Sequence, residues 1–600
     1  MDIENIKLNV EDAFLNNFYV IPDYQREYVW TEKNVNQLFE DIYDEFQNKP
    51  DSEYFIGSIV VCKIDDKRFE VIDGQQRLTT LFLCLCAFKK LLKNNKDYLD
   101  NIKPKLFAKK LNSKGKLLPS YKLILQYEGS SDIIQKISEE NEFQKEDLKG
   151  SSKNILDVYS YLINYLGNNF KGEEELTRFL GYLNNKVNFI QIETPSISDA
   201  LKIFETINAR GVGLNPMDLL KNLIFRQVDK KEFDLLKMEW RKIMNSLEKN
   251  KEKPLRFLRY FIMANYKVKN SKGEAIVRED EIYNWITQDI NVQQCNYKER
   301  PFEFVKKIQE NVNLYVKFAQ GLDKDGQRHV YLDNIKKLSG SFSQHLVLFL
   351  AAKNFKKELF DQLAKQIEVL IFHYIITRTQ TKELERKLSG WAKQLLKISE
   401  LDKEEQKNGL NDFIEKIIKV EIKSKENEFK ASFMNFNYNN LQQYRLRYIL
   451  GKIAQYIEQE RLGQKDPELL DEYTKTKIEI EHILPDNPVN DLKMAFEETK
   501  GEGDYEEYKI KLGNLTLLEK PINVVAGREF FKNKKPLYEK SKFLLTRSLT
   551  RLEHVGKDSS INRINGQLRS FEKWDKASIN ERQKMLFELA KKIWAIEILD

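Results

Sequence analysis

The first 230 residues alternate between stretches of β-type patterning and amphipathic helical segments. Residues 54–64 (YFIGSIVVCKI) and 68–73 (RFEVID) are β-branched and apolar, and the acidic pair between them predicts a turn. Residues 187–194 (VNFIQIET) predict a further strand. Thr31 is placed as the N-cap of a helix whose apolar residues recur on one face. We therefore predict a mixed domain of strands and helices.

From about residue 230 to 430 almost every segment has helical periodicity, with Lys and Glu on faces that we expect to be solvated. The pattern changes near residue 440. Residues 477–485 (KIEIEHILP) alternate as a strand does, residues 512–520 (LGNLTLLEK) offer a second strand, and a basic helical region follows. The predicted fold is α+β, helix-rich and multidomain, with a mixed domain at 1–230, an all-α coupling region at 231–435 and a ββα unit at 436–600.

The composition fits a folded protein and excludes several classes. Of the 600 residues 41% are apolar and 32% charged, with 24 Gly and 13 Pro, too few for a disordered chain. The net charge of +7 permits nucleic-acid binding without requiring it. The four cysteines include no CxxC pair, which argues against a disulfide framework or a zinc ribbon. No stretch approaches the ~20 apolar residues that a membrane span needs, and no signal peptide is evident, so we expect a cytoplasmic protein without a membrane partner.

The sequence VIDGQQRLTT (71–80) places a cation where a helix dipole disfavours it. A strand ends at Ile72, a helix begins at once, and Arg77 falls in its first turn. One interpretation is a capping box with Asp73 as N-cap and Gln76 as its partner, but this leaves Arg77 unexplained. Free backbone N–H groups, two amides and a guanidinium would together form a cradle for phosphate. The chain contains no P-loop sequence, and the apolar run after Arg77 predicts a buried helix.

Four stretches occur in the order and spacing of a known domain: IPDYQREYVW, IGSIVV, DGQQRLTTL and FETINARGVGLNPMDLLKN. Residues 8–230 resemble the DGQQR-motif domain of GmrSD-like, modification-dependent (type IV) restriction enzymes. The resemblance implies a ParB/sulfiredoxin-like fold that binds and hydrolyses an NTP, GTP or ATP. A glycine turn with Asn215 as N-cap would explain the last stretch equally well.

The resemblance implies nucleotide-binding roles for residues of two motifs, namely Tyr24, Gln25, Arg26, Asp73, Gly74, Gln75, Gln76 and Arg77. Arg77 would pair with phosphate oxygens. Asp73 would hold Mg²⁺ or orient water, because a carboxylate beside a phosphate is a common magnesium setting. Both residues are therefore candidates for the hydrolytic step.

One histidine stands apart from the other four. His329, His345 and His373 lie in helical contexts and are interpreted as structural or solvated. His482 ends a predicted strand directly after Glu481. A carboxylate beside a histidine at a strand end suits a metal ligand beside a general base, although most Glu-His pairs are surface residues.

The sequence EIEHILP…KLGNLTLLEKPIN resembles the HNH-type domain that GmrSD-like enzymes carry as their nuclease half, over about residues 440–600. The resemblance implies a ββα-metal fold in which His482 activates water. Glu481 and Asn523 would hold one Mg²⁺ or Mn²⁺ ion, and Asn514 would brace the loop. Family members often have Asp at the position of Glu481, and Glu remains a competent oxygen ligand.

Basic and aromatic residues are interleaved in REFFKNKKPLYEKSKF (528–543). We expect a DNA-backbone surface formed by Arg528, Lys532, Lys534 and Lys540, with Lys535 and Lys542. A solvated helix face would explain the same pattern.

These motifs together predict a single-chain, NTP-dependent or NTP-regulated DNA endonuclease that restricts foreign, modified phage DNA. Its partners would be double-stranded DNA and an NTP, and the sequence leaves the oligomeric state open, a homo-oligomer included. Two alternatives remain: an NTP-binding, DNA-binding regulator without nuclease activity, and an RNA-cleaving abortive-infection toxin.

Overall fold

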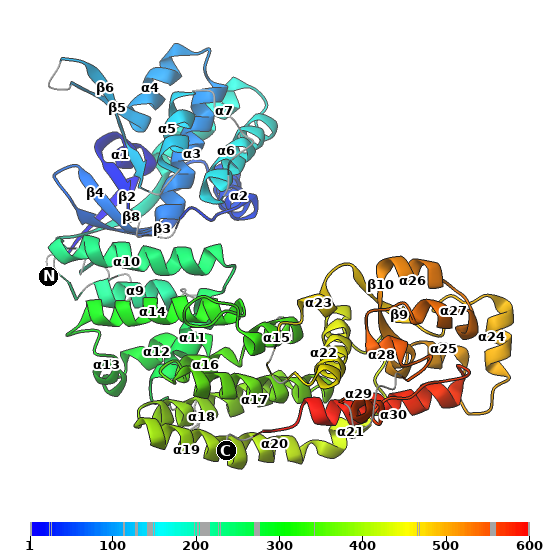
Figure 1. Ribbon diagram of the computed structural model, residues 1–600. Coiled ribbons are helices and arrows are strands. Elements are labelled where there is room, and N and C mark those ends of the chain that lie inside the picture. The colour runs from blue at the N-terminus through cyan, green and yellow to red at the C-terminus, as the bar shows by residue number, and fades with distance from the viewer. Residues whose placement is uncertain are drawn as a thin grey trace. The chain divides into compact units, whose positions relative to one another are not determined.

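The computed structural model describes residues 3–22, 25, 27–111, 115–126, 130–140, 148, 150–196, 199–200, 203, 216–225, 227–228, 230–268, 276–340, 342–464, 466, 468–552 and 560–597 (Figure 1). By its internal contacts the chain separates into two compact units. The first comprises Met1–Lys242 and Ile286–Lys306, and the second Ile243–Trp285 and Lys307–Asp600. Within the described ranges, no helix has both the length and the apolar character to cross a bilayer.

A six-stranded mixed sheet forms the centre of the first unit. Its strands, in spatial order, are β1 (Glu4–Asn9), β8 (Val187–Thr194), β3 (Tyr54–Lys63), β4 (Arg68–Asp73), β2 (Phe18–Ile21) and β7 (Leu123–Leu125). The pairs β1–β8 and β3–β4 are antiparallel, and the other three are parallel. The predicted turn between β3 and β4 is confirmed, because the Asp65 side chain accepts hydrogen bonds from the backbone of Lys67 and Arg68.

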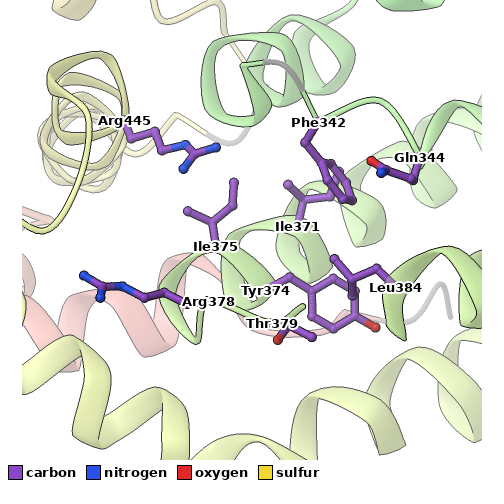
Figure 2. Close-up of a pocket in the computed structure, with 9 residues that line it drawn as sticks. All are labelled: Phe342, Gln344, Ile371, Tyr374, Ile375, Arg378, Thr379, Leu384 and Arg445. Atoms are coloured by element: carbon purple, nitrogen blue, oxygen red, sulfur yellow. The ribbon is translucent and has the colours of Figure 1, made fainter. Parts of the chain in front are cut away.

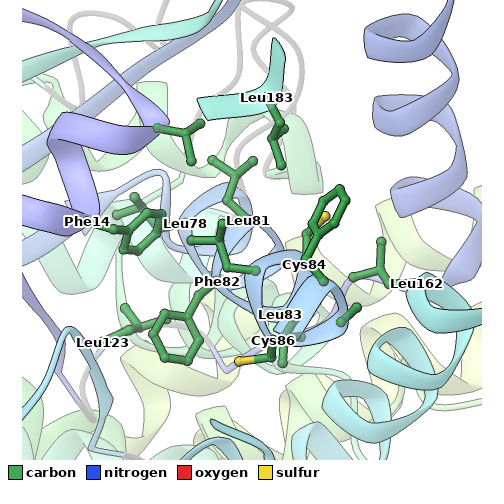
Figure 3. Packing of buried hydrophobic residues seen from close by; sticks show 14 of the residues in the cluster. Phe14, Leu78, Leu81, Phe82, Leu83, Cys84, Cys86, Leu123, Leu162 and Leu183 are labelled. Carbon is green, nitrogen blue, oxygen red and sulfur yellow. The ribbon is translucent and has the colours of Figure 1, made fainter. Parts of the chain in front are cut away.

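The first unit also contains helices, and one of them runs through its core. They are α1 (Val10–Asn16), α2 (Glu32–Asn48), α3 (Gln75–Leu91), α4 (Lys96–Leu106), α5 (Ser130–Glu139), α6 (Gly150–Asn169), α7 (Glu173–Lys186), α9 (Pro216–Phe225) and α13 (Asp289–Cys295), with a hairpin of β5 (Phe107–Leu111) and β6 (Leu117–Tyr121). Every residue of α3 from Leu78 to Lys89 is buried, as predicted, and Cys84 and Cys86 are core residues (Figure 3). Thr31 caps α2 in a capping box with Asn34.

The secondary structure described from about residue 230 to 435 consists of helices joined by short turns, as the periodicity predicts. Three of its helices, α10 (Lys230–Lys249), α12 (Ile282–Thr287) and α14 (Pro301–Ala319), span a boundary between the units. The others are α11 (Pro254–Asn265), α15 (Val330–Ser339), α16 (Leu346–Ala351), α17 (Lys357–Ile376), α18 (Thr381–Ser399), α19 (Lys403–Phe413), α20 (Lys419–Ser424) and α21 (Glu426–Met434). His329, His345 and His373 are buried among them, which confirms a structural role.

The C-terminal part of the second unit contains the predicted strand, loop, strand and helix. Its elements are α22 (Gln443–Leu462), α23 (Asp471–Thr474), β9 (Ile478–His482), α24 (Asn490–Glu497), α25 (Tyr505–Lys509), β10 (Leu515–Glu519), α26 (Lys520–Ala526), α27 (Phe531–Tyr538), α28 (Leu544–Arg547), α29 (Ser560–Asn565) and α30 (Lys576–Ile593). β9 and β10 are antiparallel, with Leu515 opposite His482. α26 begins directly after β10.

Two arginines at the start of α22 contact elements on either side of it. Arg445 donates from Nε to the carbonyl of Leu338 at 3.0 Å and from Nη2 to that of Ser339 at 3.2 Å, at the end of α15. Arg447 donates to the carbonyl of Ile478, the first residue of β9, at 2.7 Å. A cavity of about 390 Å³ opens beside Arg445 (Figure 2). It is lined by Phe342, Gln344, Ile371, Tyr374, Ile375, Arg378, Thr379, Leu384 and Arg445.

Candidate functional site

The turn between β4 and α3 holds the DGQQR motif. Asp73 is the last residue of β4, and Gly74 is the N-cap of α3 in a left-handed conformation (φ 89°). A Cβ on Gly74 would lie 2.4 Å from Cγ2 of Ile59, so both the backbone angle and the space require glycine. The capping-box interpretation of Asp73 and Gln76 is therefore wrong, because the cap has shifted by one residue and makes no side-chain hydrogen bond.

The Gln76 side chain instead forms hydrogen bonds to the backbone of residues 27–30, which precede α2. Its Oε1 accepts from the backbone N–H groups of Val29 at 3.0 Å and Trp30 at 3.2 Å, and its Nε2 donates to the carbonyl of Glu27 at 3.0 Å. One amide side chain thus satisfies three backbone groups of the first motif. The buried hydroxyl of Tyr28 adds a 2.7 Å contact to that of Thr80 on α3. These hydrogen bonds join the first motif, IPDYQREYVW, to the DGQQR motif, so the two form one structural unit.

Arg77 has partners within the protein. Its Nη1 donates to the carbonyl of Ile56 at 2.8 Å, and it interacts with the carboxylate of Asp73. Burial raises the pKa of Asp73, and the charge of Arg77 opposes that shift. Within the described part of the chain the guanidinium makes this one hydrogen bond, so most of its donors remain available to a ligand.

Gly57 makes room for the Arg77 side chain. It has φ 100°, and a Cβ there would lie 2.3 Å from Nη1 of Arg77. The position of the Arg77 guanidinium in the DGQQR motif therefore requires a glycine at position 57 in IGSIVV.

The other predicted nucleotide-binding residues are described only in part. Gln25 lies near the start of the first motif, and its Nε2 is buried without a hydrogen-bond partner in the described ranges. Gln75 is half-buried at the first position of α3. Tyr24 and Arg26 lie outside the described residues, as do residues 204–215 of the fourth stretch with Asn215.

The second candidate site lies at the end of β9. The ring of His482 meets that of Tyr438 edge to face, with the centroids 4.8 Å apart. Burial lowers the pKa of His482 to about 4, and the nearby carboxylate of Asp486 opposes that shift. The imidazole is therefore neutral at pH 7, and its Nε2 is buried without a partner among the described residues.

Asn514 ties together the loop that follows His482. Its Oδ1 accepts from the backbone of Leu484 at 2.7 Å and from the indole of Trp574 at 2.9 Å. Its Nδ2 donates to the carbonyls of Leu484 and Lys509, both at 2.8 Å. All four hydrogen-bonding positions of this fully buried amide are filled, so the side chain acts as a brace.

Helix α30 contacts Gly513 and Leu515, the residues on either side of Asn514. The sequence patterns did not suggest this contact. The fully buried Arg582 donates to the carbonyls of Gly513 at 2.7 Å and Leu515 at 2.6 Å. A Cβ on Gly513 would lie 2.3 Å from the carbonyl oxygen of Ile579 on α30. Gly513 is thus required for close packing of the second strand against this helix.

Glu481 is committed to contacts inside the domain. It is 6% exposed, and its Oε1 accepts from Nζ of Lys534 and the hydroxyl of Tyr538, both at 2.7 Å. Lys534 also donates to the carbonyls of His482 at 3.0 Å and Ile483 at 3.3 Å. The three N–H donors of this fully buried lysine thus meet three acceptors around the end of β9.

Asn523, the other expected metal ligand, contacts a different carboxylate. Its Nδ2 donates to Oε2 of Glu479 at 2.8 Å, and its Oδ1 is buried without a partner in the described ranges. No group of three or more His, Cys, Asp and Glu side chains in the described ranges is arranged to hold a metal ion.

The basic segment after α26 is only partly a surface. Arg528, Lys532, Lys540 and Lys542 are exposed, and Lys542 pairs with Glu472. Lys535 is half-buried and donates to the carbonyl of Phe571 at 3.0 Å. Lys534 does not contact DNA in this conformation, because it is buried with Glu481. Its place in the predicted DNA surface is corrected accordingly.

Comparison with known proteins bears on both sites. Residues 7–225 match the family described as GmrSD restriction endonuclease, N-terminal domain, and residues 423–589 match GmrSD restriction endonucleases, C-terminal domain. An uncharacterized protein of Methanocaldococcus jannaschii is 24% identical over an alignment of 276 residues, and the match covers 38% of this chain and 43% of that protein. The chain thus spans less than half of that relative. The two matched segments contain the DGQQR turn and the His482 strand, and the chain belongs to the GmrSD restriction endonuclease family.

Proposed function

We propose that this chain is an NTP-regulated, metal-dependent endonuclease that cuts foreign, modified DNA. Family membership supports a restriction nuclease. The observation that carries the proposal is the position of His482, at the end of β9 and directly before a loop that Asn514 braces with four hydrogen bonds.

His482 would act as the general base. Because burial keeps its imidazole neutral at pH 7, it can accept a proton from water. The water oxygen then forms a bond to phosphorus while the bond from phosphorus to the leaving oxygen breaks, and that oxygen takes up a proton. The contacts of Lys534 with the carbonyls of His482 and Ile483 hold the base in place during this exchange.

A Mg²⁺ or Mn²⁺ ion, when bound, would stabilise the negative charge that develops on the phosphate. Asn523 fits the role of ligand, because its buried Oδ1 has no donor in the described ranges. Glu481, the other ligand that the resemblance implies, would have to bind the ion while it remains bonded to Lys534 and Tyr538.

The DGQQR turn would bind the phosphates of an NTP. Arg77 offers N–H donors beyond the one that contacts Ile56, and α3 offers the free backbone N–H groups of its first turn. Gln25 contributes a buried amide without a partner in the described ranges, which suits a phosphate oxygen. Asp73 lies beside Arg77 and would hold Mg²⁺ or orient water.

Exposed cations near the nuclease site would hold the DNA backbone. Arg528, Lys532 and Lys540 are exposed on the segment that follows α26. Phosphate contacts of this kind position the duplex without reading its sequence.

A cleavage matrix tests the proposal. Unmodified, methylated, glucosylated and phosphorothioated plasmids are each incubated with the protein and Mg²⁺ or Mn²⁺, with and without GTP or ATP. Cleavage of at least one modified substrate, changed by the nucleotide, is expected. Binding without cleavage would favour the regulator, and degradation of RNA with intact plasmid would favour the toxin.

A further inference from the structure

Strand β9 carries two carboxylates, and they have different partners. Glu479 and Glu481 are two residues apart on one strand, so they point to the same face. α27 supplies Lys534 and Tyr538 to Glu481, whereas α26 supplies Asn523 to Glu479. Because α26 packs beside Glu479 and α27 packs beside Glu481, the two carboxylates have separate hydrogen-bond partners.

Glu479 holds a charged, partly exposed position. Its carboxylate accepts from Asn523 at 2.8 Å and lies 3.3 Å from Nζ of Lys520. A strong acceptor therefore faces the amide nitrogen of Asn523.

This contact determines which end of the Asn523 amide is left for a ligand. With Nδ2 bonded to Glu479, Oδ1 points elsewhere, and it is buried without a donor in the described ranges. If the amide were rotated by 180°, its oxygen would face the carboxylate, and two acceptors would repel each other. Hard divalent cations bind amide oxygens and not amide N–H groups.

We propose that Glu479 is a positioning residue that holds Asn523 with its oxygen toward the catalytic cation, a role that rests on the proposed nuclease function. Outer-shell partners of this kind orient metal ligands and tune metal affinity. Glu479 belongs to neither the DGQQR motif nor the Glu481-His482 pair.

The test compares Glu479→Gln with Glu479→Ala in the full-length protein. A glutamine keeps an oxygen that accepts from Nδ2 of Asn523, whereas alanine removes it. Mn²⁺ affinity is measured by electron paramagnetic resonance, without DNA, and cleavage is measured on the best substrate of the matrix. We expect Glu479→Ala to weaken Mn²⁺ binding and cleavage by ~10- to 100-fold and Glu479→Gln to stay within a few-fold of wild type.

Glu588→Ala is the matched control, because it removes an exposed glutamate that pairs with Lys591 on α30. A second comparison uses the Asn523→Ala background. There Glu479→Ala should cause no further loss of Mn²⁺ affinity, because Glu479 acts through Asn523. This comparison also separates positioning from a general effect on folding, which would persist in both backgrounds.

Three results would overturn the inference. They are Mn²⁺ binding by Glu479→Ala equal to that of wild type, a loss of affinity in Glu479→Gln as large as in Glu479→Ala, and additive losses of affinity for Glu479→Ala and Asn523→Ala. The second result would make Glu479 a direct metal ligand. Failure of the proposed nuclease function is distinct, since wild-type protein would then bind Mn²⁺ but cut no substrate.

Discussion

Nζ of Lys534 lies 2.7 Å from Oε1 of Glu481, and both side chains are buried at the end of the strand that carries His482. Replacement of one partner leaves the other charge buried and uncompensated. Lys534→Met should therefore lower the free energy of unfolding by ~3–5 kcal/mol, measured by chemical denaturation. The double variant Lys534→Met with Glu481→Gln should lose less unfolding free energy than the sum of the losses of the two single variants.

The exposed Lys540 provides the control for this experiment. Lys540→Met removes a lysine from the same segment and should change stability by no more than ~0.5 kcal/mol. Equal losses for the two lysine variants would show that the buried contact with Glu481 is not the cause.

Removal of the imidazole should stop DNA cleavage while the nucleotide site continues to work. His482→Ala is expected to lower the cleavage rate by ~10²-fold or more, because proton transfer from water then lacks its acceptor. NTP hydrolysis by the same preparation should persist. Cleavage at the wild-type rate in this variant would remove His482 from the mechanism.

Gly57→Ala tests the link between the glycine of β3 and Arg77. The added Cβ would lie 2.3 Å from Nη1 of Arg77 at a backbone φ of 100°, so the guanidinium must move. We expect calorimetric NTP affinity to fall as it does in Arg77→Ala, with an unchanged circular dichroism spectrum. Gly167→Ala, on α6 with no heavy atom within 4 Å of the new Cβ, should bind NTP normally.

The two sites should influence each other. A helical region with few Gly or Pro residues joins them in the sequence, and such a region can carry a two-state change between sites. NTP should change the rate of DNA cleavage at saturating DNA by ~5-fold or more, and Asp73→Ala should abolish that dependence. Equal cleavage rates for wild type and Asp73→Ala, with and without NTP, would mean that the domains act independently.

Two buried histidines should make the protein less stable in acid. Burial lowers the pKa of His345 to about 3 and that of His373 to about 4 from an ordinary value of 6.5. The unfolded chain takes up protons below pH 6.5 while the folded chain does not, so stability falls as pH drops from 6.5 toward 4. The slope is about 1.4 kcal/mol per pH unit for each histidine.

His345→Phe should flatten this dependence. The ring of His345 stacks on that of Phe342, so a phenyl ring suits its surroundings. Unfolding midpoints measured between pH 4 and 7 should fall less steeply in the variant than in wild type. Parallel curves would show that His345 does not titrate in this range.

Local patterns were sufficient for most elements of the fold. Thr31 is an N-cap, β3 and β4 form a hairpin, and α3 is buried, because each depends on residues close in sequence. The Asp73 capping box was wrong since Gly74, with no Cβ, can adopt the left-handed cap, and Gln76 finds three backbone partners on a distant segment.

Partners that come from distant segments could not be predicted in the same way. Lys534 and Lys532 are indistinguishable as letters in a basic segment, yet one is buried and the other exposed. Alternation along β9 places Glu479 and Glu481 on one face, but which helix covers each acid depends on the packing of α26 and α27. The sequence therefore indicated which residues lie at the end of β9 but not which partner each acid has.

The two arginines at the start of α22 connect the strand that carries His482 to the helical region. Arg445 donates two hydrogen bonds to carbonyls at the end of α15. Arg447 donates one to the carbonyl of Ile478, the first residue of β9, four residues before His482. β9 is in turn paired with β10, with Leu515 opposite His482. Lysine cannot reproduce the fork of Arg445. The start of α22 thus joins the end of α15 to the first residue of β9 through two guanidinium groups.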